Sequence, residues 1–87
     1  MLNWFDVFKV LECLIERFGG GKEKEKNFLA LKWAPKKRIQ LLKRTANWAA
    51  RHAGLKRPPK PMELLEARQL VGRLLRRALE EAAKKRR

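Results

Sequence analysis

The sequence predicts an all-α protein, a small bundle of three main helices, and three observations support this fold class. Apolar residues recur every three or four positions in three separate stretches, which is the period of an amphipathic helix. No stretch shows the two-residue alternation of a half-buried strand. Two of the stretches begin at a proline and two end at a glycine, where helices favour these residues. A chain of 87 residues with this pattern is expected to form one domain with a small core.

A nearly neutral amphipathic helix is predicted over residues 1–18. Asn3 is a favourable N-cap, Asp6 lies in the first turn where the helix dipole favours an acid, and Gly19 supplies a stop. This helix has more apolar surface than one small intramolecular contact would cover, so we expect it to seal the core or to join a second copy or another subunit. The predicted association face consists of Trp4, Phe5, Phe8, Val10, Leu11, Ile15 and Phe18.

Residues 19–27 are predicted to form a flexible linker, because three glycines are followed by the charged run KEKEK. Asn27 is then expected to cap a short helical turn. That turn must end near Ala34, because a residue that precedes a proline avoids the α region. The linker separates the first helix from a basic region, residues 28–87, which we expect to carry the binding function of the protein.

The basic region is predicted to contain two helices that each begin at a proline. The second helix runs from Pro35 to Ala53, before Gly54, and the third runs from Pro61 to Ala83. The stretch KRPPKP between them cannot be helical and forms a basic, proline-rich connector. We expect the two helices to pack as a hairpin-like pair that presents a basic surface.

The positive charge of this region is the strongest functional signal. The chain has a net charge of +14, and between Asn27 and Met62 it carries ten Lys or Arg and no acid. A helix surface that is only solvated usually mixes the two signs, so we expect a polyanionic partner. The phosphate backbone of a nucleic acid is favoured, because counterion release supplies affinity without any base being read. The predicted contact residues are Lys36, Lys37, Arg38, Lys43, Arg44, Arg51, Lys56, Arg57, Lys60, Arg73 and Arg77, and Trp48 is the candidate for stacking on a base.

The same composition argues against catalysis and metal binding. One His, one Cys, one Asp and no Ser leave too few groups for a nucleophile, a base and an orienting residue, or for a set of metal ligands. We therefore expect no enzymatic activity, no cofactor and no metal. The lone Cys13 cannot form an internal disulfide, and neither a secretory signal nor a membrane-spanning stretch is apparent. A cytoplasmic location, or one inside a nucleoprotein particle or virion, is expected.

The favoured function is non-catalytic binding of nucleic acid, of architectural or nucleoprotein type, with little sequence specificity and with duplex DNA slightly preferred to structured RNA. Two alternatives stay open. The stretch ANWAARHAGL resembles the first helix of helix-turn-helix regulators, although KRPPKP interrupts the short turn which that motif needs. A membrane-surface or adaptor module could use the aromatic residues of the first helix, but its polar side carries more acids than the lysine-rich face typical of such helices.

Overall fold

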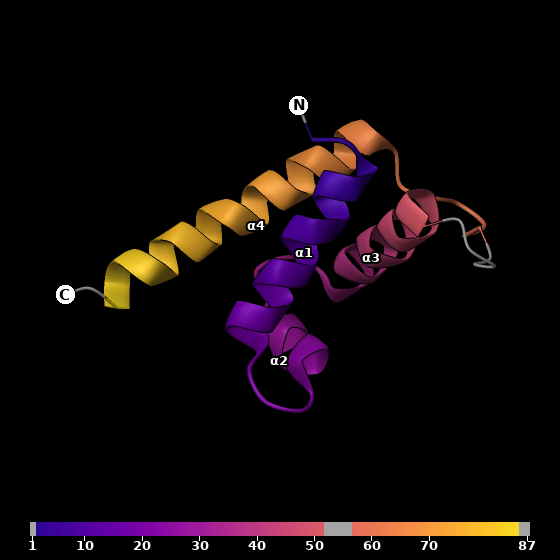
Figure 1. Cartoon of the computed structure of the whole chain (residues 1–87). Helices are drawn as coiled ribbons and strands as arrows, with labels where there is room; N and C mark the ends of the chain where they lie inside the picture. The colour runs from indigo at the N-terminus through magenta and orange to yellow at the C-terminus, as the bar shows by residue number, and fades with distance from the viewer. Residues whose placement is uncertain (1, 52–56, 86–87) are drawn as a thin grey trace.

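The structure, a computed structural model, describes residues 2–51 and 57–85. The described residues contain helices and no strand, which confirms the all-α class. The number of helices differs from the prediction, because a short helix lies where part of the linker was expected. In chain order the helices are α1 (Trp4–Gly19), α2 (Lys24–Ala30), α3 (Lys36–Arg51) and α4 (Leu64–Lys85) (Figure 1).

Helix α1 is the centre of the fold. It packs against α2, α3 and α4, whereas α3 and α4 make few close contacts with each other (Figure 1). Its apolar stripe is covered on all of these sides, so that Val7 and Leu11 are completely buried and Ile15 nearly so. The prediction that the second and third helices form a hairpin-like pair is therefore wrong. Both helices pack on α1 because burying its broad apolar stripe is favourable, and residues of all three helices join one core.

The N-terminal end of α1 is capped as the sequence predicts. The Asp6 backbone N–H donates to Asn3 Oδ1 at 2.9 Å, and the Asn3 N–H donates to Asp6 Oδ2 at 3.2 Å, which completes a capping box. The C-terminal end lies one residue later than expected, because Gly19 is still helical and Gly20 is the C-cap, with a φ of 59°. A side chain at Gly19 would collide with α2, since an added Cβ would lie 2.1 Å from the Lys24 carbonyl oxygen.

Helix α2 corrects the predicted linker, because residues 24–27 belong to this helix. Asn27 lies inside α2 and does not cap it, and its Nδ2 donates to the Gly20 carbonyl oxygen at 2.9 Å. At the first turn, the Glu16 carboxylate accepts a hydrogen bond from Lys24 Nζ and raises the pKa of this ammonium group above its usual value. These bonds attach α2 to the end of α1.

An aromatic cluster explains why so short and charged a segment is helical. Phe28 and Trp33 are almost completely buried, and their ring centroids are 5.4 Å apart in an edge-to-face arrangement. Phe18 of α1 adds a second edge-to-face contact with Trp33 at 5.0 Å. A helix of 7 residues is unstable alone, so the packing of Phe28 and Trp33 on α1 stabilises α2 more than its own sequence does.

Helix α4 begins three residues later than predicted, at Leu64 and not at Pro61. The backbone N–H of the buried Met62 donates to Thr45 Oγ1 of α3 at 3.1 Å, and this bond holds residues 61–63 outside the helix. Helix α3 starts next to Pro35 as expected and is helical to Arg51, and the predicted stop at Gly54 lies outside the described residues.

The molecule is elongated, with extents of 44 × 30 × 20 Å. Helix α4 packs on the core through Ala67, Val71 and Leu74, and its C-terminal part extends away from the other helices (Figure 1). The N-terminus is held against this helix, because Arg68 Nε donates to the Leu2 carbonyl oxygen at 2.6 Å. In the described part of the chain, no helix combines the length and the hydropathy needed to cross a membrane.

Candidate nucleic-acid interface

In the fold, acids from other helices pair with some of the basic residues of α3. Lys43 Nζ lies 3.1 Å from Glu25 Oε1 of α2, and Arg38 forms an ion pair with Glu66 of α4. All four side chains are partly exposed, so each pair contributes little to stability. Their effect on the local charge is larger, because α2 and α4 supply the acids that the sequence of α3 lacks.

Arg77 is also engaged within the protein. Its guanidinium group lies 2.8 Å from Glu80 Oε2 and 3.6 Å from Glu81 Oε1 on the same helix. The same group lies 5.8 Å from the centroid of the Trp33 ring, which places it against the aromatic cluster. Arg77, which was predicted to contact nucleic acid, thus has acid partners within α4 and an aromatic neighbour in the core.

The other predicted contact residues differ in what the structure shows of their partners. The side chains of Arg51 and Lys56 lie outside the described part of the structure, and Arg57 lies 5.7 Å from the centroid of the Trp48 ring. Within residues 2–50 and 57–84, no ion pair is found for the remaining predicted cations, which are Lys36, Lys37, Arg44, Lys60 and Arg73.

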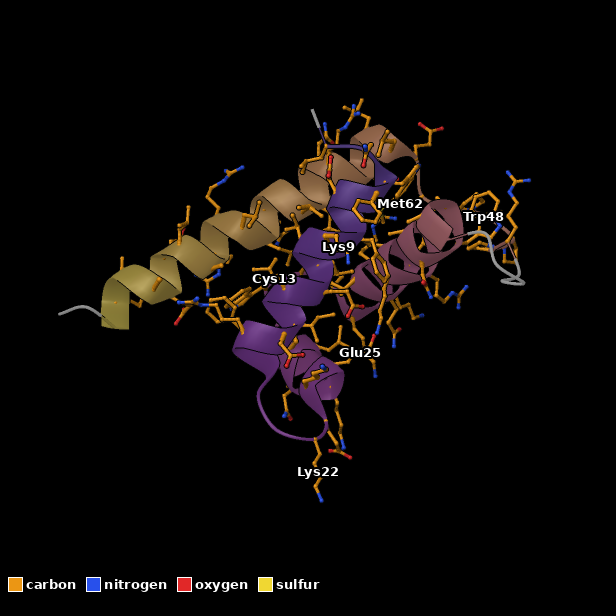
Figure 2. All side chains as sticks on the ribbon, in the orientation of Figure 1. Lys9, Cys13, Lys22, Glu25, Trp48 and Met62 are labelled. Atoms are coloured by element: carbon orange, nitrogen blue, oxygen red, sulfur yellow. The ribbon has the colours of Figure 1, made fainter. Side chains whose placement is uncertain are left out.

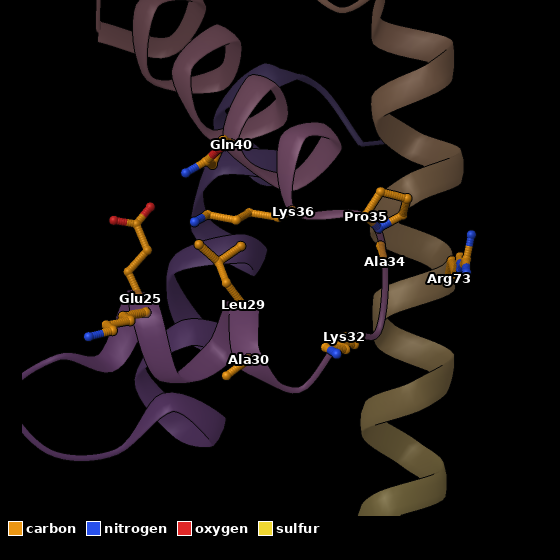
Figure 3. A pocket seen from close by; sticks show the side chains of 10 residues that line it. Glu25, Leu29, Ala30, Lys32, Ala34, Pro35, Lys36, Gln40 and Arg73 are labelled. Carbon is orange, nitrogen blue, oxygen red and sulfur yellow. The ribbon is translucent and has the colours of Figure 1, made fainter.

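Two of these free cations, Lys36 and Arg73, line the same groove. We call it the main groove; it has a volume of about 870 Å³ and lies between α2, the start of α3 and α4 (Figure 3). Its lining contains four cations and one acid around an apolar middle section. The lining residues are Glu25, Lys26, Leu29, Ala30, Lys32, Ala34, Pro35, Lys36, Gln40 and Arg73.

A second, smaller groove of about 380 Å³ adjoins the main groove, because Lys32 and Arg73 line both. Arg76 also lines this smaller groove, and it too has no ion pair among the described residues. Among the described residues, the two grooves therefore bring together four exposed cations that have no ion pair, from three separate parts of the chain. We call this set, Lys32, Lys36, Arg73 and Arg76, the basic strip.

The sequence reasoning missed Lys32 and Arg76. Lys32 was assigned to a helical turn, whereas it lies just beyond α2, where its N–H donates to the Leu29 carbonyl oxygen at 3.2 Å. With a φ of 56°, Lys32 is the one residue other than glycine with a positive φ in the described chain. This left-handed conformation costs a residue with a Cβ roughly 1 kcal/mol. The signal for Arg76 was its spacing of three residues from Arg73, which places both on neighbouring positions of one helix face.

The first turn of α3 adds to the positive potential of the strip. It contains no acid, and Lys36 and Lys37 lie where the backbone N–H groups and the helix dipole are already positive. Cations at this end destabilise a helix by a few tenths of a kcal/mol to about 1 kcal/mol each. An anion bound at this point would remove that cost.

Trp48 lies near the C-terminal end of α3, next to the connector that leads to α4 (Figure 2). The groove residues of α3, Lys36 and Gln40, lie near the opposite end of the helix. One face of the indole is close to the Arg57 guanidinium group. The structure therefore does not bring Trp48 together with the basic strip.

The predicted association face on α1 lies mostly inside the protein. Phe8, Leu11 and Ile15 are buried, and Trp4, Val10 and Phe18 are partly buried against the core. Only Phe5 of this set is exposed, at 56%. The first helix thus seals the core of its own chain. Most of the exposed large apolar side chains lie on α4 instead, namely Leu65, Leu75 and Leu79.

In comparisons with protein-family models, with curated proteins and with solved structures, nothing matches this chain. Among the described residues, no group of three or more His, Cys, Asp or Glu side chains is placed to hold a metal ion. The candidate site is therefore the main groove together with the basic strip, whose cations have no acid partner among the described residues.

Proposed function

We propose that this protein binds nucleic acid through the sugar-phosphate backbone, with the basic strip as the contact surface. The observation that carries the proposal is the separation of the cations. Arg38 and Lys43 are neutralised by acids from other helices, whereas the four cations of the strip have no acid partner among the described residues and lie together around connected grooves. Free cations that converge in this way favour a ligand with repeated negative charges.

The types of side chain in the strip suit phosphate better than base edges. The ammonium groups of Lys32 and Lys36 act as point charges, which contact phosphate oxygens without selecting a base. The guanidinium groups of Arg73 and Arg76 can bind phosphate oxygens in pairs. Binding is therefore expected to depend on the backbone and to show little sequence preference, as in an architectural or nucleoprotein component.

The helix-turn-helix alternative is less well supported by the arrangement of the helices. That motif joins its two helices by a turn of about three or four residues. Here, the next described helix after α3 is α4, which begins at Leu64 after the non-helical residues 57–63, and both helices pack on α1. A recognition helix that follows α3 directly is therefore absent from the described segments.

The salt dependence of binding tests the proposal. About four phosphate contacts, one for each cation of the basic strip, give a log-log slope of affinity against salt near −3.6 for duplex DNA, and unrelated duplexes of equal length should bind alike. Fluorescence anisotropy of the whole chain with labelled duplexes measures both quantities. A slope shallower than about −2, or a large preference for one sequence at fixed salt, contradicts backbone binding. Vesicles of anionic lipid at the same salt should bind more weakly than the duplexes, and stronger binding to the vesicles would favour a membrane surface.

A further inference from the structure

The main groove contains more than a phosphate site requires, because its lining changes from one side to the other. Figure 3 shows Glu25, Gln40 and the amino group of Lys36 on one side of the groove and Lys32 and Arg73 on the opposite side. Between them the lining is apolar, formed by Leu29, Ala30, Ala34 and Pro35. A surface that contacts only phosphates has no need of an apolar section, and Glu25, which also pairs with Lys43, adds a carboxylate to the lining.

The three sections of the groove match the three chemical parts of a nucleotide. Cations at Lys32 and Arg73 suit the phosphates, and an apolar section suits the faces of a base. The carboxylate of Glu25 can only accept hydrogen bonds, whereas the Gln40 amide can both donate and accept. These two groups suit a base edge that bears an amino group, as adenine, cytosine and guanine do.

The volume of the main groove is also suitable for a nucleotide. Its volume of about 870 Å³ lies within the range of sites that enclose small molecules, which is roughly 300–1,000 Å³. The bases of an intact duplex are stacked and paired, so they cannot enter such a groove. A nucleotide in a single strand, an overhang or a bulge can do so.

We infer that the main groove takes one unpaired nucleotide of a bound strand, with its base on the apolar section and its amino-bearing edge toward Glu25 and Gln40. The phosphates of this nucleotide lie at the side formed by Lys32 and Arg73. This inference rests on the proposed function and narrows its ligand to nucleic acids that carry unpaired nucleotides.

The first experiment compares two ligands with the unmodified protein. One is a blunt 20-base-pair duplex, and the other is the same duplex with a single unpaired cytidine in the middle. At equal salt we expect the bulged duplex to bind about fivefold more tightly or better, since the base gains apolar contact and a hydrogen bond to a charged group. A bulged uridine should gain less than a bulged cytidine, because uridine lacks the amino group.

A pair of variants with equal charge tests the role of Glu25. Glu25→Gln should abolish the preference for bulged cytidine over bulged uridine, and it should tighten binding of the blunt duplex by up to a few-fold, because it removes an acid and releases Lys43. The matched control is Glu23→Gln, which also removes an acid of an ion pair and releases Lys26, while Glu23 itself does not line the groove. This control should keep the preference for cytidine. Thermal unfolding of both variants verifies that each is folded.

The outcomes separate this inference from the proposed function. If the blunt and bulged duplexes bind equally and with a steep salt dependence, the groove does not take a nucleotide, while backbone binding stands. If the cytidine preference survives in Glu25→Gln, the assigned position of the base edge is wrong. If neither duplex binds with a steep salt dependence, both proposals fail.

Discussion

Two groups of cations in this protein look alike in the sequence and differ in the fold. Arg38 and Lys43 of α3 are paired with Glu66 and Glu25, which come from helices on either side of α3 in the chain. Lys32 and Lys36, only a few residues earlier, have no such partner among the described residues and line the main groove. The difference shows that an acid-free stretch of sequence is not yet a binding surface. Tertiary contacts decide which of its charges are free.

The largest expected effect comes from removing the free cations as a set. The triple variant Lys32→Gln, Lys36→Gln and Arg73→Gln should reduce the magnitude of the salt slope by about 0.9 for each lost phosphate contact, or about 2.7 in total. The control is Arg38→Gln, Lys43→Gln and Lys84→Gln, which removes three cations that form ion pairs. Anisotropy titrations on one duplex at several salt concentrations measure both slopes. Equal losses in the two variants would show that affinity follows net charge and not the basic strip.

A smaller effect of opposite sign is expected when a paired cation is released. Glu66→Gln leaves Arg38 without its ion pair, so Arg38 becomes available to phosphate and the duplex should bind a few-fold more tightly. The free energy of unfolding should fall by less than about 1 kcal/mol, because the pair is partly exposed. Chemical denaturation and titration of the same sample give the two values. Weaker duplex binding with the fold intact would contradict the distinction between paired and free cations.

Lys32→Gly should raise the stability of the protein and weaken its binding to nucleic acid. Glycine adopts a positive φ without strain, so relief of the left-handed backbone should raise the free energy of unfolding by up to about 1 kcal/mol, partly offset by the greater flexibility of glycine in the unfolded chain. The magnitude of the salt slope should fall by about 0.9, because one phosphate contact is lost. Lys32→Arg keeps the charge and should keep the slope. A glycine variant that binds as the unmodified protein does would remove Lys32 from the strip.

The smallest effect on binding is expected for Gly72→Ala, next to Arg73 of the strip. An added Cβ at Gly72 meets no atom within 4 Å, and alanine favours a helix over glycine, so the free energy of unfolding should rise by up to about 1 kcal/mol. Duplex affinity should not change, because no charge is added or lost. Thermal unfolding and anisotropy check the two expectations. A clear change in affinity would show that the stability of α4, and not only its charge, controls binding.

The sequence predicted the parts of the fold that depend on local chemistry. The N-cap at Asn3 and the start of α3 beside Pro35 follow from neighbouring residues, and both are confirmed. The short helical turn predicted after Asn27 was misplaced, because α2 begins at Lys24 and its stability depends on Phe28 and Trp33 packing on another helix. The hairpin-like pair was wrong for a related reason: an apolar stripe shows which face of a helix is buried, but not which helix covers it.

The candidate site was predicted in part. Lys36 and Arg73 were on the predicted list, and both line the main groove. Lys32 and Arg76 were missed, since the strip combines a connector, a helix start and the middle of a distant helix. The neutralisation of Arg38 and Lys43 could not be anticipated, because their partners are acids from α4 and α2 that become neighbours only in the folded chain.

The central position of α1 has a consequence for the order in which the chain folds. Helices α1 and α2 are close in sequence, so their contacts can form early, with little loop to close. The rest of the α1 stripe is covered by α3 and α4, and the bond from Arg68 to the Leu2 carbonyl oxygen joins the N-terminal residues to the first turns of α4. During synthesis the part of the α1 stripe that α4 covers therefore stays exposed until α4 has left the ribosome. A nascent chain that ends before Leu64 can bury α1 against α2 and α3 only, so even a chain that lacks just this helix keeps apolar surface exposed and is prone to aggregation.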